Sequence, residues 1–147
     1  MTSSLDTLAS QAAAQLSEPD TWFGLSGHRV TGEAVAHHLE AAAHLMEREN
    51  WDPQLYAPFT GHHLSDALAS TAKDGQGDAD TRFIARTVME TLLQVVMGAP
   101  YVDYEIWSQH STRTLEEVVT LCRTAAKIAR HVGPEQPGTG TPNPPLP

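Results

Sequence analysis

The sequence is short of cysteine, of positive charge and of long apolar runs. Its one cysteine, Cys122, cannot form an intramolecular disulfide, so the usual staple of small secreted proteins is missing. Nine Lys and Arg face 18 Asp and Glu, a formal net charge of −9, whereas binding to nucleic acid or anionic membranes needs clustered positive charge. No stretch approaches the roughly 20 apolar residues of a membrane span, and the N-terminus does not resemble a signal peptide. We therefore expect a cytoplasmic protein that binds neither nucleic acid nor membranes.

The sequence is rich enough in apolar residues to fold. It has 147 residues, 40% of them hydrophobic, which fits about one domain. Apolar positions recur at helical spacing, and no alternating strand pattern is present. The expected helices cover residues 31–49, 63–73, 80–97 and 114–132, with a shorter helical piece at 101–109. The third of these becomes apolar nearly all round at its end, which predicts that this end is buried. We predict an all-α fold, a small bundle of about four main helices.

The composition divides the chain into three parts. Residues 1–30 form a leader segment with a weak, alanine-rich helix. The Trp22-Phe23 pair is predicted to act as a hydrophobic plug, that is, to pack into the domain and so anchor this leader to it. Residues 31–132 form the helical domain. Residues 133–147 are rich in Pro and Gly, have almost nothing to bury and are predicted to be a disordered tail.

Histidine is the residue type that most suggests chemistry. His37, Glu40 and His44 fall on one face of the expected helix 31–49, and imidazole with carboxylate suits Zn²⁺, Fe²⁺ or Mn²⁺. This spacing is also typical of a solvated polar face, which is the interpretation the residues favour. The pattern indicates a candidate metal site but no particular cofactor.

A second group of residues could line a ligand pocket. His38 lies at the edge of an apolar face, where it must find a hydrogen-bond partner or stay neutral. Tyr104 and Trp107 lie one turn apart, and His62 and His63 stand at the entrance to the expected helix 63–73. The alternative for each is ordinary: a structural histidine, exposed loop histidines and core aromatics. Cys122 falls in an apolar stripe, which predicts a buried, inert thiol.

Two segments resemble a known family. They are Leu-Glu-Ala-Ala at 39–42 followed by Trp51, and Trp107 followed by Arg-Thr-Leu-Glu-Glu-Val at 113–118. Together they resemble a family of small actinobacterial helical proteins of unknown function, over about residues 34–130. Members usually carry a cysteine early in the middle helix and an Asn-Asp pair after the second tryptophan. This sequence has His-His-Leu-Ser-Asp at 62–66 and Ser-Gln at 108–109 instead, so an activity resting on those residues would be absent here or would use His63 and Gln109.

The sequence carries no common enzyme signature, and its acidity is uneven: residues 31–80 hold nine acids and two bases, whereas residues 113–132 hold two acids and four bases. We therefore expect a non-enzymatic accessory or regulatory protein of a bacterium that binds a protein partner, or a second copy of itself, through an acidic, His-rich face. The alternative is a small helical enzyme or a ligand- or metal-binding protein with a His- and aromatic-lined pocket.

Overall fold

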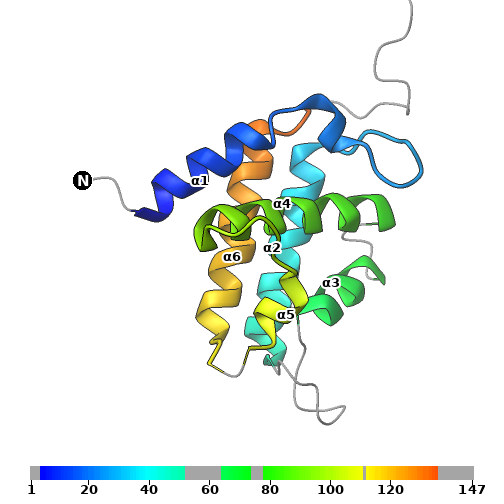
Figure 1. Cartoon of the computed structure of the whole chain (residues 1–147). Coiled ribbons are helices and arrows are strands. Elements are labelled where there is room, and N and C mark those ends of the chain that lie inside the picture. The colour runs from blue at the N-terminus through cyan, green and yellow to red at the C-terminus, as the bar shows by residue number, and fades with distance from the viewer. Residues whose placement is uncertain (1–3, 52–63, 74–77, 111, 136–147) are drawn as a thin grey trace, which may run out of the picture.

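The structure, a computed structural model, describes residues 4–51, 64–73, 78–110 and 112–135, and the regular elements of this part of the chain are all helical (Figure 1). This confirms the predicted all-α fold. The elements in chain order are α1 (Ser4–Gln15), a 3₁₀ turn η1 (Pro19–Trp22), α2 (Gly32–Glu49), α3 (Leu64–Lys73), α4 (Ala79–Met97), α5 (Tyr104–Ser108) and α6 (Leu115–Val132).

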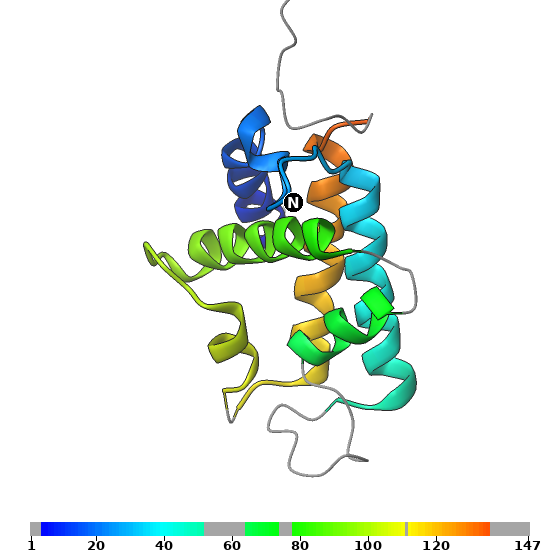
Figure 2. The ribbon, with the colours of Figure 1, turned by 90° about the vertical axis from the view of Figure 1, so that its right-hand side faces the viewer.

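Two long helices, α2 and α6, form the central pair of the bundle. They lie side by side and antiparallel, and α4 runs across them, as Figures 1 and 2 both show. Helix α1 packs against α4 and α6, and α3 packs against α2. The inner faces of these helices supply one continuous apolar core, in which Leu39, Met89 and Ala125 are fully buried. The short α5 is attached to α4 and α3 at the edge of this core.

Side-chain caps fix where the main helices begin. The Oγ1 of Thr31 accepts a hydrogen bond from the backbone N–H of Ala34, 3.0 Å away, at the start of α2. The predicted capping box at the start of α6 is confirmed, because Thr114 and Glu117 exchange hydrogen bonds between side chain and backbone. Gly98 ends α4 in the left-handed conformation, with φ +66°. The helix boundaries therefore fall within a few residues of those expected.

The leader segment is part of the core. Trp22 is 1% exposed and its Nε1 donates a hydrogen bond to the carbonyl oxygen of Leu16 at 2.9 Å. Ala12 and Leu16 on the α1 side belong to the same apolar cluster as α2 and α6. The predicted tryptophan plug is thus confirmed, with Trp22 as the buried member of the pair.

The start of α2 and the end of α6 meet through glycine. The Gly32 N–H donates to the carbonyl oxygen of Pro134 at 2.9 Å, and a Cβ placed on Gly32 would lie 2.8 Å from the Cα of Gly133. Only glycine allows two backbones to approach this closely. The first two residues of the predicted tail, Gly133 and Pro134, therefore contact the helical domain, and residues 136–147 lie outside the described residues.

None of the described helices is both long enough and apolar enough to cross a membrane.

Candidate functional site

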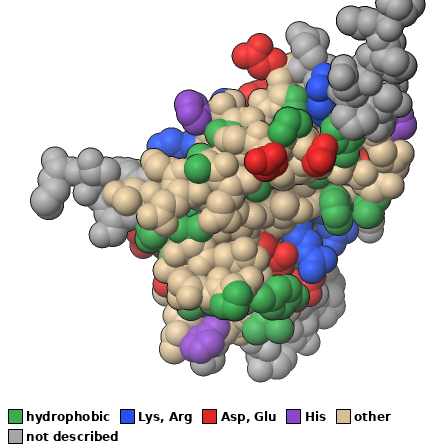
Figure 3. All heavy atoms as spheres, turned by 45° about the horizontal axis from the view of Figure 1, so that its top comes forward, with side chains coloured by type: hydrophobic (Ala, Val, Ile, Leu, Met, Phe, Trp, Pro, Cys, Tyr) green, Lys and Arg blue, Asp and Glu red, His purple; other side chains and the backbone are tan. Residues whose placement is uncertain are grey.

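The acidic side of α2 is already paired with α6. Glu33, Glu40 and Glu47 are spaced seven residues apart and face Arg130 and Arg123. The guanidinium of Arg130 donates to both oxygens of Glu33 and of Glu40, at distances of 2.6–3.0 Å. These hydrogen bonds lower the pKa of both carboxyls. Three of the nine acids of residues 31–80 are therefore engaged by two arginines of α6. Figure 3 shows that the face it displays carries both acidic and basic side chains.

The predicted metal ligands lie along one hollow on α2. His37, Glu40 and His44 line a depression of about 390 Å³ together with Arg48 and Thr71. Glu40 is held by Arg130, so a metal ion would have to displace that ion pair. Among the described residues, no three His, Cys, Asp or Glu side chains are arranged to hold a metal. The metal site stays a prediction that this geometry does not support.

His38 joins α2 to α3. Its side chain is fully buried, and its Nε2 lies 2.9 Å from the carbonyl oxygen of Leu68. A carbonyl only accepts, so Nε2 carries the proton in the neutral ring. Burial lowers the pKa of His38, although the bond to Leu68 opposes that shift. The ring's Nδ1 has no partner among the described residues. His38 therefore acts in the described structure as a neutral structural residue, consistent with the need for a partner expected from the sequence.

This burial predicts a pH-dependent stability. Because the pKa of His38 is lower in the folded state than in the unfolded chain, the unfolded chain binds the proton first as pH falls below about 6.5. Stability should fall from that pH downward, by at most about 1.4 kcal/mol per pH unit for one proton. The charged groups that face His38, namely Arg82, Asp78 and His37, modify this shift less than burial does.

The measurement is urea unfolding between pH 7.5 and 5.0 for wild type, His38→Gln and His44→Gln. The glutamine at 38 keeps a donor for Leu68 and cannot be protonated, so it should flatten the dependence. His44 is exposed on the same helix and should leave it unchanged. A slope unaltered by His38→Gln would contradict the assignment.

The three candidate pocket residues that the structure describes, His38, Tyr104 and Trp107, do not line the same hollow. Tyr104 lines a hollow with α3 and the first half of α4, whereas Trp107 lines a different groove with the last turns of α4 and with α6. His38 lines neither hollow. His62 and His63 lie outside the described residues, so their part in the prediction stays untested. The short α5 thus separates two depressions that the sequence had suggested as one.

The groove of Trp107 is apolar with an acidic rim. It has a volume of about 280 Å³ between the C-terminal half of α4, α5 and the first half of α6. Its floor contains buried leucines and its rim contains exposed glutamates: Leu92, Leu93, Leu121, Glu116 and Glu117. The guanidinium of Arg113 stacks 3.9 Å from the centroid of the Trp107 ring and holds this ring in place.

The end of α4 leaves large apolar side chains in solvent beside this groove. Leu93 is buried, but Val96 is 40% and Met97 56% exposed. The prediction that this end of the helix is buried was therefore wrong for its outer face. The cause is tertiary: this end projects beyond the crossing with α6, so no helix of the described structure covers it (Figure 2). The apolar residues on all sides of the last turns of α4 were therefore the sequence feature that indicated this exposed apolar surface.

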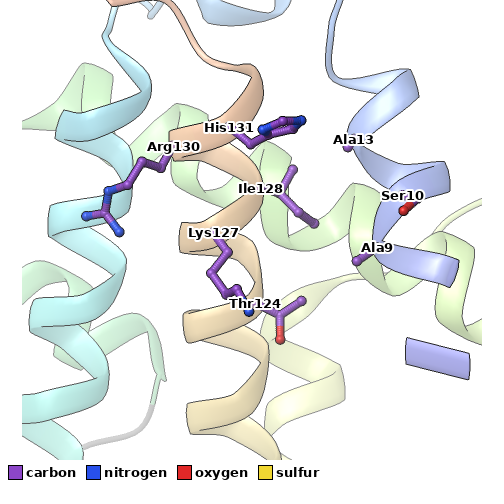
Figure 4. Close-up of a pocket in the computed structure, with 8 residues that line it drawn as sticks. All are labelled: Ala9, Ser10, Ala13, Thr124, Lys127, Ile128, Arg130 and His131. Carbon is purple, nitrogen blue, oxygen red and sulfur yellow. The ribbon is translucent and has the colours of Figure 1, made fainter. Parts of the chain in front are cut away.

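A further hollow, of about 740 Å³, lies between α1 and α6 (Figure 4). Small side chains of α1, Ala9 and Ala13, leave the space, and Ile128 and His131 of α6 point toward it. Arg130, which also lines it, is turned toward α2, where Glu33 and Glu40 hold it. The sequence analysis did not anticipate this hollow, since it depends on how the leader docks.

The remaining candidate nucleophile is inert. Cys122 is fully buried in α6, and burial raises the pKa of its thiol to about 12. Its thiolate, the reactive form, is therefore scarce at neutral pH, as predicted.

Together these features define a small helical protein with two hollows on either side of α5, one between α1 and α6, and a shallow depression on α2. The model of a family of unknown function, DUF6197, matches residues 30–128, so the chain belongs to this family. No curated protein and no solved structure matches the chain.

Proposed function

We propose that this protein is a non-enzymatic binding module that docks an amphipathic helix of a partner protein in the groove between α4, α5 and α6. The observation that carries the proposal is the exposure of Val96 and Met97 beside an apolar groove. Large apolar side chains exposed beside a concave apolar floor are typical of helix-in-groove recognition. The groove has room for one or two large apolar side chains of the partner.

Charge indicates what kind of helix would fit. Glu116 and Glu117 line the groove, whereas the nearby Arg113 is stacked on Trp107. The whole chain carries a formal net charge of −9. A partner helix with apolar anchors and flanking Lys or Arg complements this rim, and a second copy of the acidic chain fits it less well. The partner is thus a basic amphipathic helix.

The groove also replaces the acidic, His-rich face of α2 as the preferred binding surface. The glutamates of that face are engaged by α6, so a partner there would have to compete with Arg130. The groove needs no such exchange. We further propose that the protein works in the cytoplasm of an actinobacterium and does not bind nucleic acid, supported by the sequence resemblance, the buried free thiol and the acidic net charge.

The test is a titration of the full chain with three synthetic peptides of about 18 residues, long enough to form a helix. The first carries leucine at helical spacing and Lys on its flanks, the second replaces Lys with Glu, and the third replaces leucine with serine. We expect calorimetry to show binding of the first only, weakened by added salt. Equal binding of the basic and acidic peptides would overturn the proposal.

Val96→Gln should weaken binding of the basic peptide about tenfold, which corresponds to ~1.4 kcal/mol. Phe83→Gln is the matched control, because Phe83 is 39% exposed on the same helix but lines the other hollow. Light scattering on the free protein tests whether a second copy of the chain occupies the groove instead. A dimer that Val96→Gln dissociates would show that a second copy fills the groove and would overturn the proposal of a partner helix.

A further inference from the structure

The hollow on the other side of α5 combines cationic and apolar side chains. It has a volume of about 480 Å³ between α3, the first half of α4, α5 and the loop around Leu25. This size is within the range of small-molecule sites. It lies away from the groove of the proposed function, and no residue lines both.

Two arginines lie on the same side of α4 and line this hollow. Arg82 and Arg86 are one helical turn apart. The Nη2 of Arg82 donates to the Oγ of Ser65 at 3.1 Å, and in the described part of the chain Arg82 forms no ion pair. Arg86 is paired with Glu90 through one N–H, at 3.4 Å. A guanidinium has five N–H donors, so both arginines retain donors for a ligand.

Tyr104 adds a neutral hydroxyl at the same place. Its side chain is 4% exposed, and burial raises the pKa of its phenol, so the phenol stays protonated at neutral pH. The guanidinium carbon of Arg86 lies 5.9 Å from the centroid of its ring. The phenol already has hydrogen-bonding partners in Ser65, Arg82 and Glu105, so the donors that the polar end of the hollow offers to a ligand are those of the two arginines.

The apolar end is formed by side chains that would otherwise prefer burial. Leu25 is 74% and Phe83 39% exposed, and alanines of α3 line the space between. A ligand with an apolar body would cover these side chains. The combination fits a molecule with an apolar body and an anionic head.

Two carboxylates at the edge restrict the charge of that head. Asp78 and Glu105 also line the hollow. One oxygen of Asp78 is engaged by the N–H and hydroxyl of Thr81, both at 2.8 Å, and Oε1 of Glu105 lies 3.5 Å from the Tyr104 hydroxyl. Their negative charges repel a dianion such as phosphate more strongly than a monoanion.

We propose that this hollow binds a small monocarboxylic acid, with its carboxylate on Arg82 and Arg86 and its apolar body between Leu25 and Phe83. Charge-assisted, bidentate hydrogen bonds from guanidinium to carboxylate provide the specificity. Binding here is independent of helix docking in the groove.

The test is calorimetric titration of the full chain with phenylacetate, octanoate, their neutral amides and inorganic phosphate. We expect saturable binding of at least one carboxylate, with its amide and phosphate at least about tenfold weaker. An amide or phosphate that binds as tightly as the carboxylates would overturn the proposal, as would no binding of either carboxylate.

Arg86→Gln and Arg82→Gln should each weaken carboxylate binding about tenfold. Arg123→Gln removes an arginine of α6 far from the hollow and should change nothing. Since Arg82→Gln breaks the contact with Ser65, Phe83→Gln provides a second variant that leaves that contact intact, and it should also weaken binding. Wild-type affinity in Arg86→Gln and Phe83→Gln would overturn the assignment. Val96→Gln should leave carboxylate binding unchanged, which separates this site from the helix groove.

Discussion

Trp22→Ala is expected to lower the free energy of unfolding by about 3–5 kcal/mol, the usual cost of deleting a buried aromatic side chain. Trp22 is 1% exposed and fills the space between the leader and the helices of the domain. Its removal would leave a cavity and would deprive the carbonyl oxygen of Leu16 of its donor. Such a loss is a large share of the stability of a domain of this size.

Urea unfolding followed by circular dichroism measures this effect. Phe23→Ala is the control, because Phe23 is the neighbouring aromatic but is only partly buried, and its loss should be clearly smaller. A Trp22→Ala protein as stable as wild type would mean that the leader does not complete the core.

Gly32→Ala is expected to lower the free energy of unfolding by about 2–3 kcal/mol, as overpacking typically does. The added Cβ would overlap the carbonyl oxygen of Ala129 and the backbone of Gly133. Both neighbours are backbone atoms, so no flexible side chain can move aside. Helix α2 would have to shift against α6 along their shared seam.

Gly98→Ala separates this steric effect from backbone conformation. Gly98 has φ +66° but nothing lies within 4 Å of its added Cβ, so only the left-handed conformation carries a cost, about 1–2 kcal/mol.

Alanine favours helices over glycine by about 1 kcal/mol, so a Gly32→Ala protein more stable than wild type would contradict the close approach of α2 and α6.

Local patterns of the sequence predicted much of the fold. Apolar periodicity and the Thr114-Glu117 capping box depend on residues a few positions apart, and both are seen in the structure. The family resemblance rested on short motifs and is confirmed by the match over residues 30–128.

The candidate site could not be predicted in the same way, because it depends on contacts between distant segments. Tyr104 and Trp107 are three residues apart, but which hollow each lines is decided by where α3 and α6 lie relative to α5. The pairing of Glu40 with Arg130 joins residues 90 positions apart and changes the acidic face of α2 from a free surface to a seam. The apolar residues at 93–97 mark the helix end that borders the groove. Their pattern alone does not distinguish a buried helix end from an exposed binding surface.

The most direct test of the proposed function is chemical-shift mapping of the isotope-labelled full chain as the basic amphipathic peptide is added. The account predicts that the largest shifts fall on the groove, at residues 92–97, at Trp107 and at residues 114–121. Shifts confined to residues 37–48 would place the partner on the His-rich face of α2 instead and would contradict it, as would the absence of any saturable shift.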